Sequence, residues 1–384
     1  MTAIDCDVVV IGAGVSGLAV TAALTDHGLD VVCLDARDRI GGRLHTIGSE
    51  QGPLDLGASW FWPGEERVQR LVAESGIAFH AQHIAGDALY DAEGGPRRLD
   101  GNPIDVAAYR YTRGAQSVTD ALASGLPPGS VRTRSPVSSV SVDAGGARVV
   151  AAGCELAARQ VVVAAPPALV AETVAFQPAL PPEVQGLARL TPIWMGSTVK
   201  VVAVYRDPFW RDAGLSGAVF SEVGPLREIH DLSGPEGDDP AALFGFGSSA
   251  PNASGPAAPH VFGPSAPNAS GLRAEQVVDQ LVRLFGPSAA APTEVVVADW
   301  SRERWTSPPG VSPSGAFQLF GHPLYQGPTL QGRVHWASTE TAAGYPGHVE
   351  GALEAAERTA SAVLREFGQS PPPGTRAAQT GKAG

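Results

Sequence analysis

Short apolar runs and longer periodic stretches alternate along this chain, and glycine or proline separates them. The runs 8–11 and 31–34 have the length and the apolar composition of buried strands. The stretch between them is predicted to be a helix that stops at Gly28. Strand, helix and strand in this order predict a parallel α/β unit at the start of the chain.

The same pattern predicts further elements. Helical periodicity is found at 65–76, 274–285 and 349–367. Apolar runs predict strands at 160–165, 196–205 and 294–300, and a β-hairpin at 137–151 that turns at Gly145 and Gly146. Residues 81–111 have the composition of a short connection rich in Gly and Asp. These elements together predict an α/β protein.

Size, charge and cysteine content narrow the class of protein. With 384 residues, of which 43% are hydrophobic, the chain is expected to form two domains. The net charge of -12 argues against nucleic acid or an anionic membrane as a partner, and favours encounter with cationic ligands. Cys6, Cys33 and Cys154 lack the spacing of metal ligands, so we expect no metal site and reduced thiols. Residues 1–5 carry no export signal, and we expect a cytoplasmic protein.

Three glycines follow the first apolar run with the spacing G-x-G-x-x-G. Gly12 permits a tight turn, Gly14 lets a pyrophosphate approach the backbone, and Gly17 lets the helix pack close to the strand. Asp35 ends the second strand, eighteen residues after Gly17, where a carboxylate can accept the ribose hydroxyls. The glycine spacing alone is weak evidence, but the flanking strand, helix, strand and acid predict a dinucleotide site.

A second glycine turn follows Asp35, with Arg37 and Arg39 before it, Gly41 and Gly42 within it and Arg43 after it. Arginines beside a close backbone approach suit a diphosphate reached from its other side, as in FAD proteins. This stretch resembles the flavin-containing amine oxidase family, which includes monoamine oxidases, polyamine oxidases and L-amino-acid oxidases. That family usually has Glu where this chain has Asp35.

The resemblance continues at 52–63, where Asp55, Gly57 and Ala58 match a D-x-G-A segment that passes beside the flavin ring. It implies that this backbone lies near the flavin and that Trp60 or Trp62 forms a wall; ordinary core packing is the alternative for both tryptophans. The resemblance implies three further cofactor contacts: Ser59, the backbone of Val137 at the adenine, and Trp300 where the chain returns to the flavin. It also places a glycine-led helix at 114–123.

The C-terminal region carries the second most diagnostic match. Residues 332–342 resemble the family's strand and turn G-x-I/V-x-F-A-G-T-E-T, and 347–352 resemble G-x-x-E-G-A. The resemblance implies that Glu340 binds near the ribityl chain or the diphosphate. It also implies that the helix beginning at Val349 points its N-terminal amides at the flavin C2 carbonyl and N1.

Three residues are candidates for catalysis. Lys200 is one charge in an apolar run, so it needs a specific neighbour or a water, or else its amine reaches solvent. In the family a lysine at this position holds a water near flavin N5. The resemblance places Phe317 and His348 in an aromatic cage; a packed, hydrogen-bonded His348 is the alternative. Ala316 aligns with the position of a flavin-linking cysteine, so FAD is expected to be non-covalent.

Several segments depart from the family. The interval 81–111 is where large monoamine oxidases have a helical substrate cap, so the site is expected to be wider or closed by a partner subunit. Residues 246–255 recur almost intact as 262–271, which predicts a duplicated surface loop with sequons at Asn252 and Asn268. The composition of 369–384 predicts a disordered tail.

These observations predict a Rossmann-like, discontinuous FAD-binding domain at 1–80, 112–170 and 306–368, and a smaller mixed-sheet substrate domain at 81–111 and 171–305. The implied activity is oxidation of a carbon bearing an amine nitrogen, with hydride passing to flavin N5 and O2 reoxidising the flavin to give H2O2. Two alternatives stay open: a flavin-dependent desaturase or dehydrogenase of a larger metabolite, and a non-catalytic flavin-holding protein.

Overall fold

The computed structural model describes residues 4–236, 240–248, 260–262, 272–307 and 317–369. The chain forms two compact units, each built from separated segments. Unit 1 comprises Met1–Gly42, Leu122–Pro192 and Ser314–Gly384, and unit 2 comprises Arg43–Ala121 and Ile193–Pro313. The expected domains differ from these units at their boundaries, because 43–80 packs within unit 2 and 171–192 packs within unit 1.

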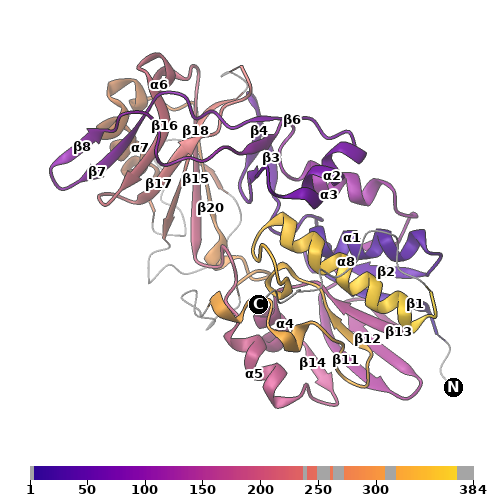
Figure 1. Cartoon of the computed structure of the whole chain (residues 1–384). Helices are drawn as coiled ribbons and strands as arrows, with labels where there is room; N and C mark the ends of the chain where they lie inside the picture. Colours follow the sequence, from indigo (N-terminus) through magenta and orange to yellow (C-terminus); the bar gives the residue numbers. More distant parts are fainter. Residues whose placement is uncertain (1–3, 237–239, 249–259, 263–271, 308–316, 370–384) are drawn as a thin grey trace, which may run out of the picture. The chain divides into compact units, whose positions relative to one another are not determined.

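A parallel sheet lies at the centre of unit 1. Its strands, in spatial order, are β10 (Val131–Arg132), β2 (Val31–Leu34), β1 (Cys6–Ile11), β13 (Cys154–Val163) and β21 (Val334–Trp336). Helices α1 (Val15–Asp26) and α8 (Val349–Glu366) run side by side on one face (Figure 1). This arrangement confirms the predicted Rossmann-like α/β fold.

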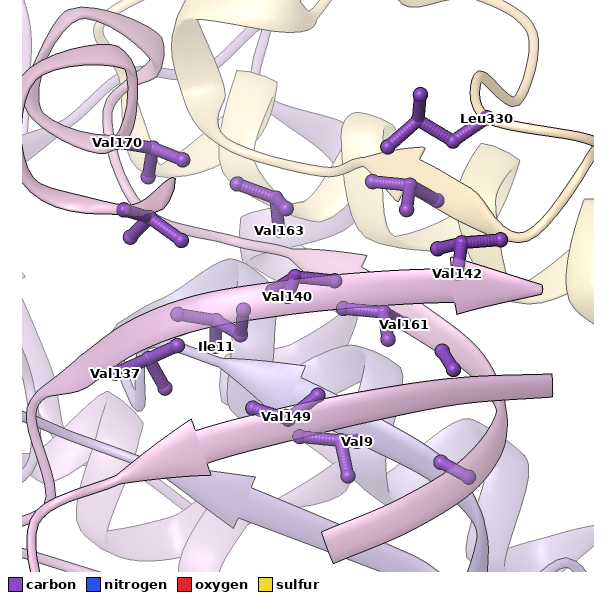
Figure 2. Close-up of a cluster of buried hydrophobic side chains, with 14 of the residues drawn as sticks. Val9, Ile11, Val137, Val140, Val142, Val149, Val161, Val163, Val170 and Leu330 are labelled. Carbon is purple, nitrogen blue, oxygen red and sulfur yellow. The ribbon is translucent and has the colours of Figure 1, made fainter. Parts of the chain in front are cut away.

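The sheet continues from β13 into antiparallel strands that pack against its other face. The predicted hairpin is present as β11 (Val137–Asp143) and β12 (Gly146–Ala151), and β14 (Ala175–Gln177) pairs with β11. Val140 and Val149 of the hairpin pack against Val9 and Val161 of the parallel strands (Figure 2). Strand β13 starts earlier than expected, because its first half pairs with β12 and its second half with β1. Helices α4 (Pro167–Thr173) and α5 (Pro182–Leu190) complete this layer.

A mixed sheet forms most of unit 2. In spatial order its strands are β19 (His260–Phe262), β20 (Glu294–Asp299), β15 (Thr198–Tyr205), β18 (Ala241–Ser248), β17 (Leu226–Asp231), β16 (Leu215–Ser221), β7 (Asp87–Ala92) and β8 (Gly95–Arg98). Helices α6 (Phe209–Asp212) and α7 (Ala274–Phe285) pack on one face. The other face packs on Leu54 and Leu56, at the end of the hairpin β3 (Thr46–Ser49) and β4 (Gly52–Asp55).

The remaining elements of unit 2 include a small sheet, with β9 (Tyr109–Tyr111) between β5 (Trp60–Phe61) and β6 (Phe79–Ala81). Helix α2 (Glu66–Glu74) lies in the same unit. Helix α3 (Ser117–Ser124) contains the point, after Ala121, at which the chain passes from unit 2 to unit 1. The prediction that 81–111 is only a connection is wrong, because β7, β8 and β9 lie within it. Gly94 and Gly95 lie at the hairpin turn between β7 and β8, and β8 is a polar edge strand, so neither gives an apolar run.

Short 3-10 helices occur at η1 (Pro287–Ala290), η2 (Trp300–Arg302), η3 (Phe317–Leu319), η4 (Pro323–Tyr325) and η5 (Thr339–Thr341). The helices predicted at 65–76, 114–123, 274–285 and 349–367 are present within a few residues of those limits. None of the helices in the described ranges is long and apolar enough to span a membrane. The sequence repeat from 249 onward, both sequons, Ala316 and the tail from 370 lie outside the described residues.

Candidate functional site

The glycine turn after β1 packs as its spacing predicts. A Cβ on Gly17 would lie 1.8 Å from the carbonyl oxygen of Gly12, so only glycine allows α1 to approach this closely. Gly12 itself has a φ of +106°, which favours glycine. Gly14 differs, because a Cβ there would have its nearest neighbour 4.0 Å away, at Gly41. The backbone at Gly14 therefore borders open space, in which a ligand can approach.

Asp35 joins the two glycine turns. One carboxylate oxygen accepts the Ala13 amide at 2.7 Å, and the other accepts the Arg37 amide at 2.8 Å. The residue is 4% exposed. An ionised carboxylate has about four acceptor positions, so these amides leave capacity for hydroxyl donors. Asp35 therefore holds the turn in place in addition to its expected ribose contact.

The second turn is held partly by its own arginine. Arg39 donates to the carbonyls of Ile40 and Gly42, at 3.0 and 2.9 Å. Gly42 has a φ of +57°, and a Cβ there would be 3.4 Å from the Cα of Gly14. The two glycine turns thus lie against each other. Arg37 precedes the second turn, and its amide donates to the Asp35 carboxylate.

Segments far apart in sequence meet at the carboxyl ends of the parallel strands. After β10, the amide of Ser135 donates to the Asp35 carbonyl at 2.8 Å, which brings Val137 to this edge. After β21, the Ala337 carbonyl accepts a hydrogen bond from the Ser16 hydroxyl in α1. Ligands of parallel α/β sheets bind at this edge. The structure therefore brings the N-terminal and C-terminal motifs together.

The turn after β21 is tied to the start of α8. Thr339 donates to the His348 carbonyl and accepts the Gly347 amide, both at 2.9 Å. Gly351 is required in the first turn of α8, because its Cβ would lie 2.2 Å from the Tyr345 carbonyl oxygen. Glu340, in this turn, is fully buried, and Val349 begins α8.

Phe317 and His348 have different surroundings. Phe317 is 56% exposed, and its ring lies 5.6 Å from that of Phe320. His348 is half-buried at the N-cap of α8, and its ring lies 6.1 Å from that of Tyr345. Tyr345 was not singled out from the sequence, although it stands three residues before His348; it is 48% exposed with a φ of +49°.

In unit 2, the predicted flavin-facing segment surrounds Lys200. The Lys200 ammonium donates to the Gly57 carbonyl at 2.9 Å and to the Ser59 hydroxyl at 2.5 Å. It also lies 4.2 Å from the centre of the Phe244 ring. The side chain is fully buried, so the alternative of an amine that reaches solvent is excluded.

Burial controls the charge of this cluster. Desolvation lowers the pKa of Lys200 to about 7, and the nearby Arg110 adds to this, while Asp55 opposes it. Desolvation also raises the pKa of Asp55, against the attraction of Lys200. One Asp55 oxygen accepts from Thr46 and from the Ala115 amide, at 2.6 and 2.8 Å. Lys200 is thus an amine that gains or loses a proton near neutral pH.

The small residues Gly57 and Ala58 allow close contact between two backbone segments of unit 2. A Cβ on Gly57 would lie 1.9 Å from the Arg43 carbonyl oxygen, so Gly57 lets two backbone segments touch. Ala58 donates its amide to the same carbonyl at 3.3 Å. Trp300 is buried and donates from Nε1 to the Leu56 carbonyl at 2.8 Å, which fixes the end of β20 against this segment.

Trp60 extends this cluster toward residues that were not singled out from the sequence. Its Nε1 donates to Gln82 at 2.8 Å, and its ring lies 4.9 Å from His230 and 5.1 Å from Phe244. His230 contacts two carboxylates, Asp105 and Glu228. The signal available in the sequence was the alternation of Glu228 and His230 along β17, but no spacing links them to Asp105.

Comparison with known proteins identifies the fold and the chemistry. Residues 80–364 match the family model for flavin containing amine oxidoreductases, and residues 10–75 match an NAD(P)-binding Rossmann-like domain. The chain belongs to the flavin-containing amine oxidoreductase family. Its members are oxidoreductases that use a flavin, so the protein is an FAD enzyme and the non-catalytic alternative is not retained.

Relatives match over nearly the whole chain. A Mycobacterium tuberculosis protein that carries the name flavin-containing monoamine oxidase AofH is 27% identical, over 93% of this chain and 96% of its own. Flavin-containing amine oxidase B of Sus scrofa is 24% identical, over 95% of this chain and 87% of its own. The aligned span with AofH covers 457 positions, more than the 384 residues here, so the relative has insertions that this chain lacks.

Solved structures share the fold. Putrescine oxidase bound to putrescine superposes with a TM-score of 0.77 at 23% identity, covering 94% of this chain and 99% of its own. Cyclohexylamine oxidase from Brevibacterium oxydans has a TM-score of 0.77 at 22% identity, covering 95% and 100%.

The residues of unit 1 fit FAD. Open space borders Gly14, and no side chain among the described residues caps the first turn of α1. Helix amides that lack a capping side chain can bind a phosphate, and the partial positive charge of the helix terminus favours this. Asp35, at the end of β2, has acceptor capacity left for ribose hydroxyls.

Proposed function

We propose that this enzyme oxidises an amine at the carbon that bears the nitrogen, with O2 as the electron acceptor. In balance, the amine, O2 and water give a carbonyl compound, ammonia or a smaller amine, and H2O2. The bound FAD supplies the hydride acceptor for this chemistry. The single observation that carries the proposal beyond family membership is Lys200, a fully buried amine at the segment that matches the family's flavin-facing motif.

The residues that we propose to hold FAD lie in two groups. In unit 1, Gly12, Gly14 and Gly17 approach the diphosphate with Arg37 and Gly42, and Asp35 binds the ribose. Val137 contacts the adenine, while Glu340 and Val349 lie at the ribityl chain and the ring. In unit 2, the group consists of Arg43, Gly57, Ala58, Ser59, Trp60 and Trp300. We propose that FAD is bound without a covalent link.

Lys200 is proposed to act on the oxygen half of the reaction. Gly57 and Ser59 fix its ammonium, so its charge has a defined position. A pKa near 7 allows the amine to hold or release a proton at physiological pH. A positioned cation stabilises negative charge that develops as electrons reach O2, and a water held by Lys200 can carry the proton.

The substrate is proposed to be an amine that reacts in its uncharged form, in a site walled by Phe317 and His348. The names of the structural relatives support an amine, since one acts on putrescine and the other on cyclohexylamine. A water-poor aromatic surrounding disfavours an ammonium and so favours the form that reacts. The cytoplasmic location and an oligomeric state both stay predictions.

A panel of amines tests this function. Each amine is mixed anaerobically with the purified holoenzyme, and flavin bleaching is followed; H2O2 is then measured in air. Bleaching and peroxide with at least one amine are expected. Bleaching only with compounds that contain no amine would instead support a desaturase or dehydrogenase of a larger metabolite. This second candidate is favoured because the chain lacks insertions that are present in AofH, which would leave more room for a large substrate.

A further inference from the structure

His230 is held between two carboxylates from different segments of unit 2. Its Nδ1 lies 2.6 Å from an oxygen of Asp105, and its Nε2 lies 2.8 Å from an oxygen of Glu228. The side chains of His230 and Asp105 are only 4% and 6% exposed, whereas that of Glu228 is 40% exposed. Asp105 and His230 are therefore the buried part of the cluster, and Glu228 is its accessible part.

Both ring nitrogens of His230 face carboxylate oxygens, so both must donate protons to satisfy these contacts. The two carboxylates raise the pKa of His230, although burial works against them. With His230 protonated, the three side chains carry a net charge of about −1. A ligand can reach this negative charge at Glu228, the only one of the three side chains with substantial exposure.

The strand register places Glu228 on the same face of the sheet as Lys200. Lys200 of β15 pairs with Phe246 of β18, and Phe246 pairs with Glu228 of β17. Directly paired residues point to the same face, and neighbouring strands are roughly 4.8 Å apart, so the backbones at Lys200 and Glu228 are roughly 10 Å apart.

Aromatic side chains border Glu228 on both sides. Phe246 lies on one neighbouring strand, and Phe220 of β16 pairs with Glu228 on the other and is 43% exposed. Rings next to an accessible carboxylate favour an organic cation, because the ring face attracts a cation while the carboxylate accepts its hydrogen bonds. A metal ion is not favoured, because both His230 nitrogens are engaged and the described residues include no metal-binding group.

We propose that Glu228, positioned by His230 and Asp105, binds a second cationic group of the substrate, remote from the amine that is oxidised. This inference rests on the proposed amine oxidation and narrows its substrate to amines with a distal ammonium, such as straight-chain α,ω-diamines. Asp105 belongs to 81–111, the segment predicted to stand where larger relatives have a substrate cap, so this segment would build part of the subsite.

Glu228→Gln removes the charge and keeps the shape. For diamines, kcat/KM is expected to fall roughly 10-fold to 100-fold, because a hydrogen bond between two charged groups is lost. The loss should lie mainly in KM. Monoamines of matching chain length should change less than about twofold, because the reacting amine does not use Glu228. An equal effect on the two classes, or none, would overturn the proposal.

A control variant separates this local effect from a change in net charge. Glu222→Gln removes one carboxylate from the end of β16, where it accepts from Tyr90. It lowers the negative charge of the protein by the same amount as Glu228→Gln. The preference for diamines over monoamines is expected to stay unchanged in Glu222→Gln. A similar loss of preference in the two variants would contradict a specific subsite.

Variants behind Glu228 test the positioning roles. Asp105→Asn and His230→Gln are expected to raise KM for diamines with little change in kcat, since neither residue reaches the reacting amine. Glu228→Asp should recover part of the affinity that Glu228→Gln loses. A fall in kcat for monoamines in Asp105→Asn with normal KM would indicate a general structural defect and contradict the positioning role.

Equilibrium binding keeps this inference separate from the proposed function. The flavin of the anaerobic holoenzyme is first reduced with dithionite, so that it cannot accept a hydride from the amine. Calorimetric titration of this reduced enzyme with a diamine and with the matching monoamine then measures affinity without turnover. Tighter binding of the diamine, lost in Glu228→Gln, supports the subsite even if no amine is oxidised. Equal affinities would overturn the subsite, although oxidation of monoamines would leave the proposed function intact.

Discussion

Lys200 shows how one buried side chain is tuned by its neighbours. Desolvation disfavours its charged form, and Asp55 partly restores it, so the pKa of the amine falls to about 7. Gly57 and Ser59 supply acceptors that replace water. A group that is half protonated near neutral pH suits a reaction that needs both a positive charge and a mobile proton.

Lys200→Met should slow reoxidation of the reduced flavin by O2 about tenfold or more, which corresponds to the loss of an interaction worth about 1.4 kcal/mol. Stopped-flow mixing of the reduced enzyme with O2 measures this step. Anaerobic reduction by substrate serves as the control and should change much less. Unaltered reoxidation in the variant would rule out the proposed role of Lys200.

The same residue predicts a pH dependence of stability. Its pKa is about 7 when folded and about 10.4 when unfolded, so between these values the unfolded state binds more protons. Lys200 therefore makes the free energy of unfolding rise as the pH increases from about 7 to about 9. Urea unfolding at several pH values should show a smaller rise in Lys200→Met than in the wild type. Parallel curves for the two proteins would contradict the lowered pKa.

Individual site residues could be identified from the sequence where their role depends on local spacing. Gly12, Gly17 and Asp35 lie within one strand, helix and strand, so their contacts follow from local geometry. Lys200 was recognisable because an isolated charge in an apolar strand requires a partner. The contact of His230 with Asp105 was not predictable, since the two are 125 residues apart and Asp105 lies in the loop between β8 and β9.

Among the elements, the contact of α1 with β1 depends on Gly17. Gly17→Ala would place a methyl group against the Gly12 carbonyl and push the helix away from the strand. The free energy of unfolding is expected to fall by about 1 to 3 kcal/mol, the usual effect of overpacking. The FAD content of the purified protein should fall with it. Denaturant unfolding and the flavin absorbance measure the two effects.

Gly186→Ala is the matched control. Gly186 lies in the interior of α5, and a Cβ there would meet nothing within 4 Å. Replacing an exposed helical glycine with alanine should raise the free energy of unfolding by about 0.5 to 1 kcal/mol. If both variants are destabilised alike, the loss in Gly17→Ala does not come from its contact with Gly12.

Elements with strong apolar patterns were predictable, and polar edge strands were not. The runs that became β1, β2 and β15 are buried on both faces, so each is a mostly apolar stretch, with Asp7 in β1 and Lys200 in β15 as the charged residues. Strand β8 has the sequence Gly-Pro-Arg-Arg at the edge of its sheet, where side chains stay in water. Such a strand forms because β7 pairs with it, and no local pattern records that pairing.

For the whole molecule, the net charge of -12 predicts how a cationic substrate arrives. A negative protein attracts cations over a distance set by the Debye length, about 30 Å at 0.01 M salt and about 8 Å at 0.15 M. Raising the salt over this range should lower kcat/KM for an ammonium substrate several-fold. Flavin reoxidation by the neutral O2 molecule should not change. A salt-independent kcat/KM would contradict this attraction.

The position of α8 in the chain has a consequence for synthesis. Leu18 and Leu24 of α1 pack against Val363 and Leu364 of α8, more than 300 residues later. The ribosome releases α1 first and α8 last, so this apolar face of the nascent chain stays uncovered during most of translation. A truncated product that ends before Val349 would keep the face exposed and become a target for chaperones and proteases.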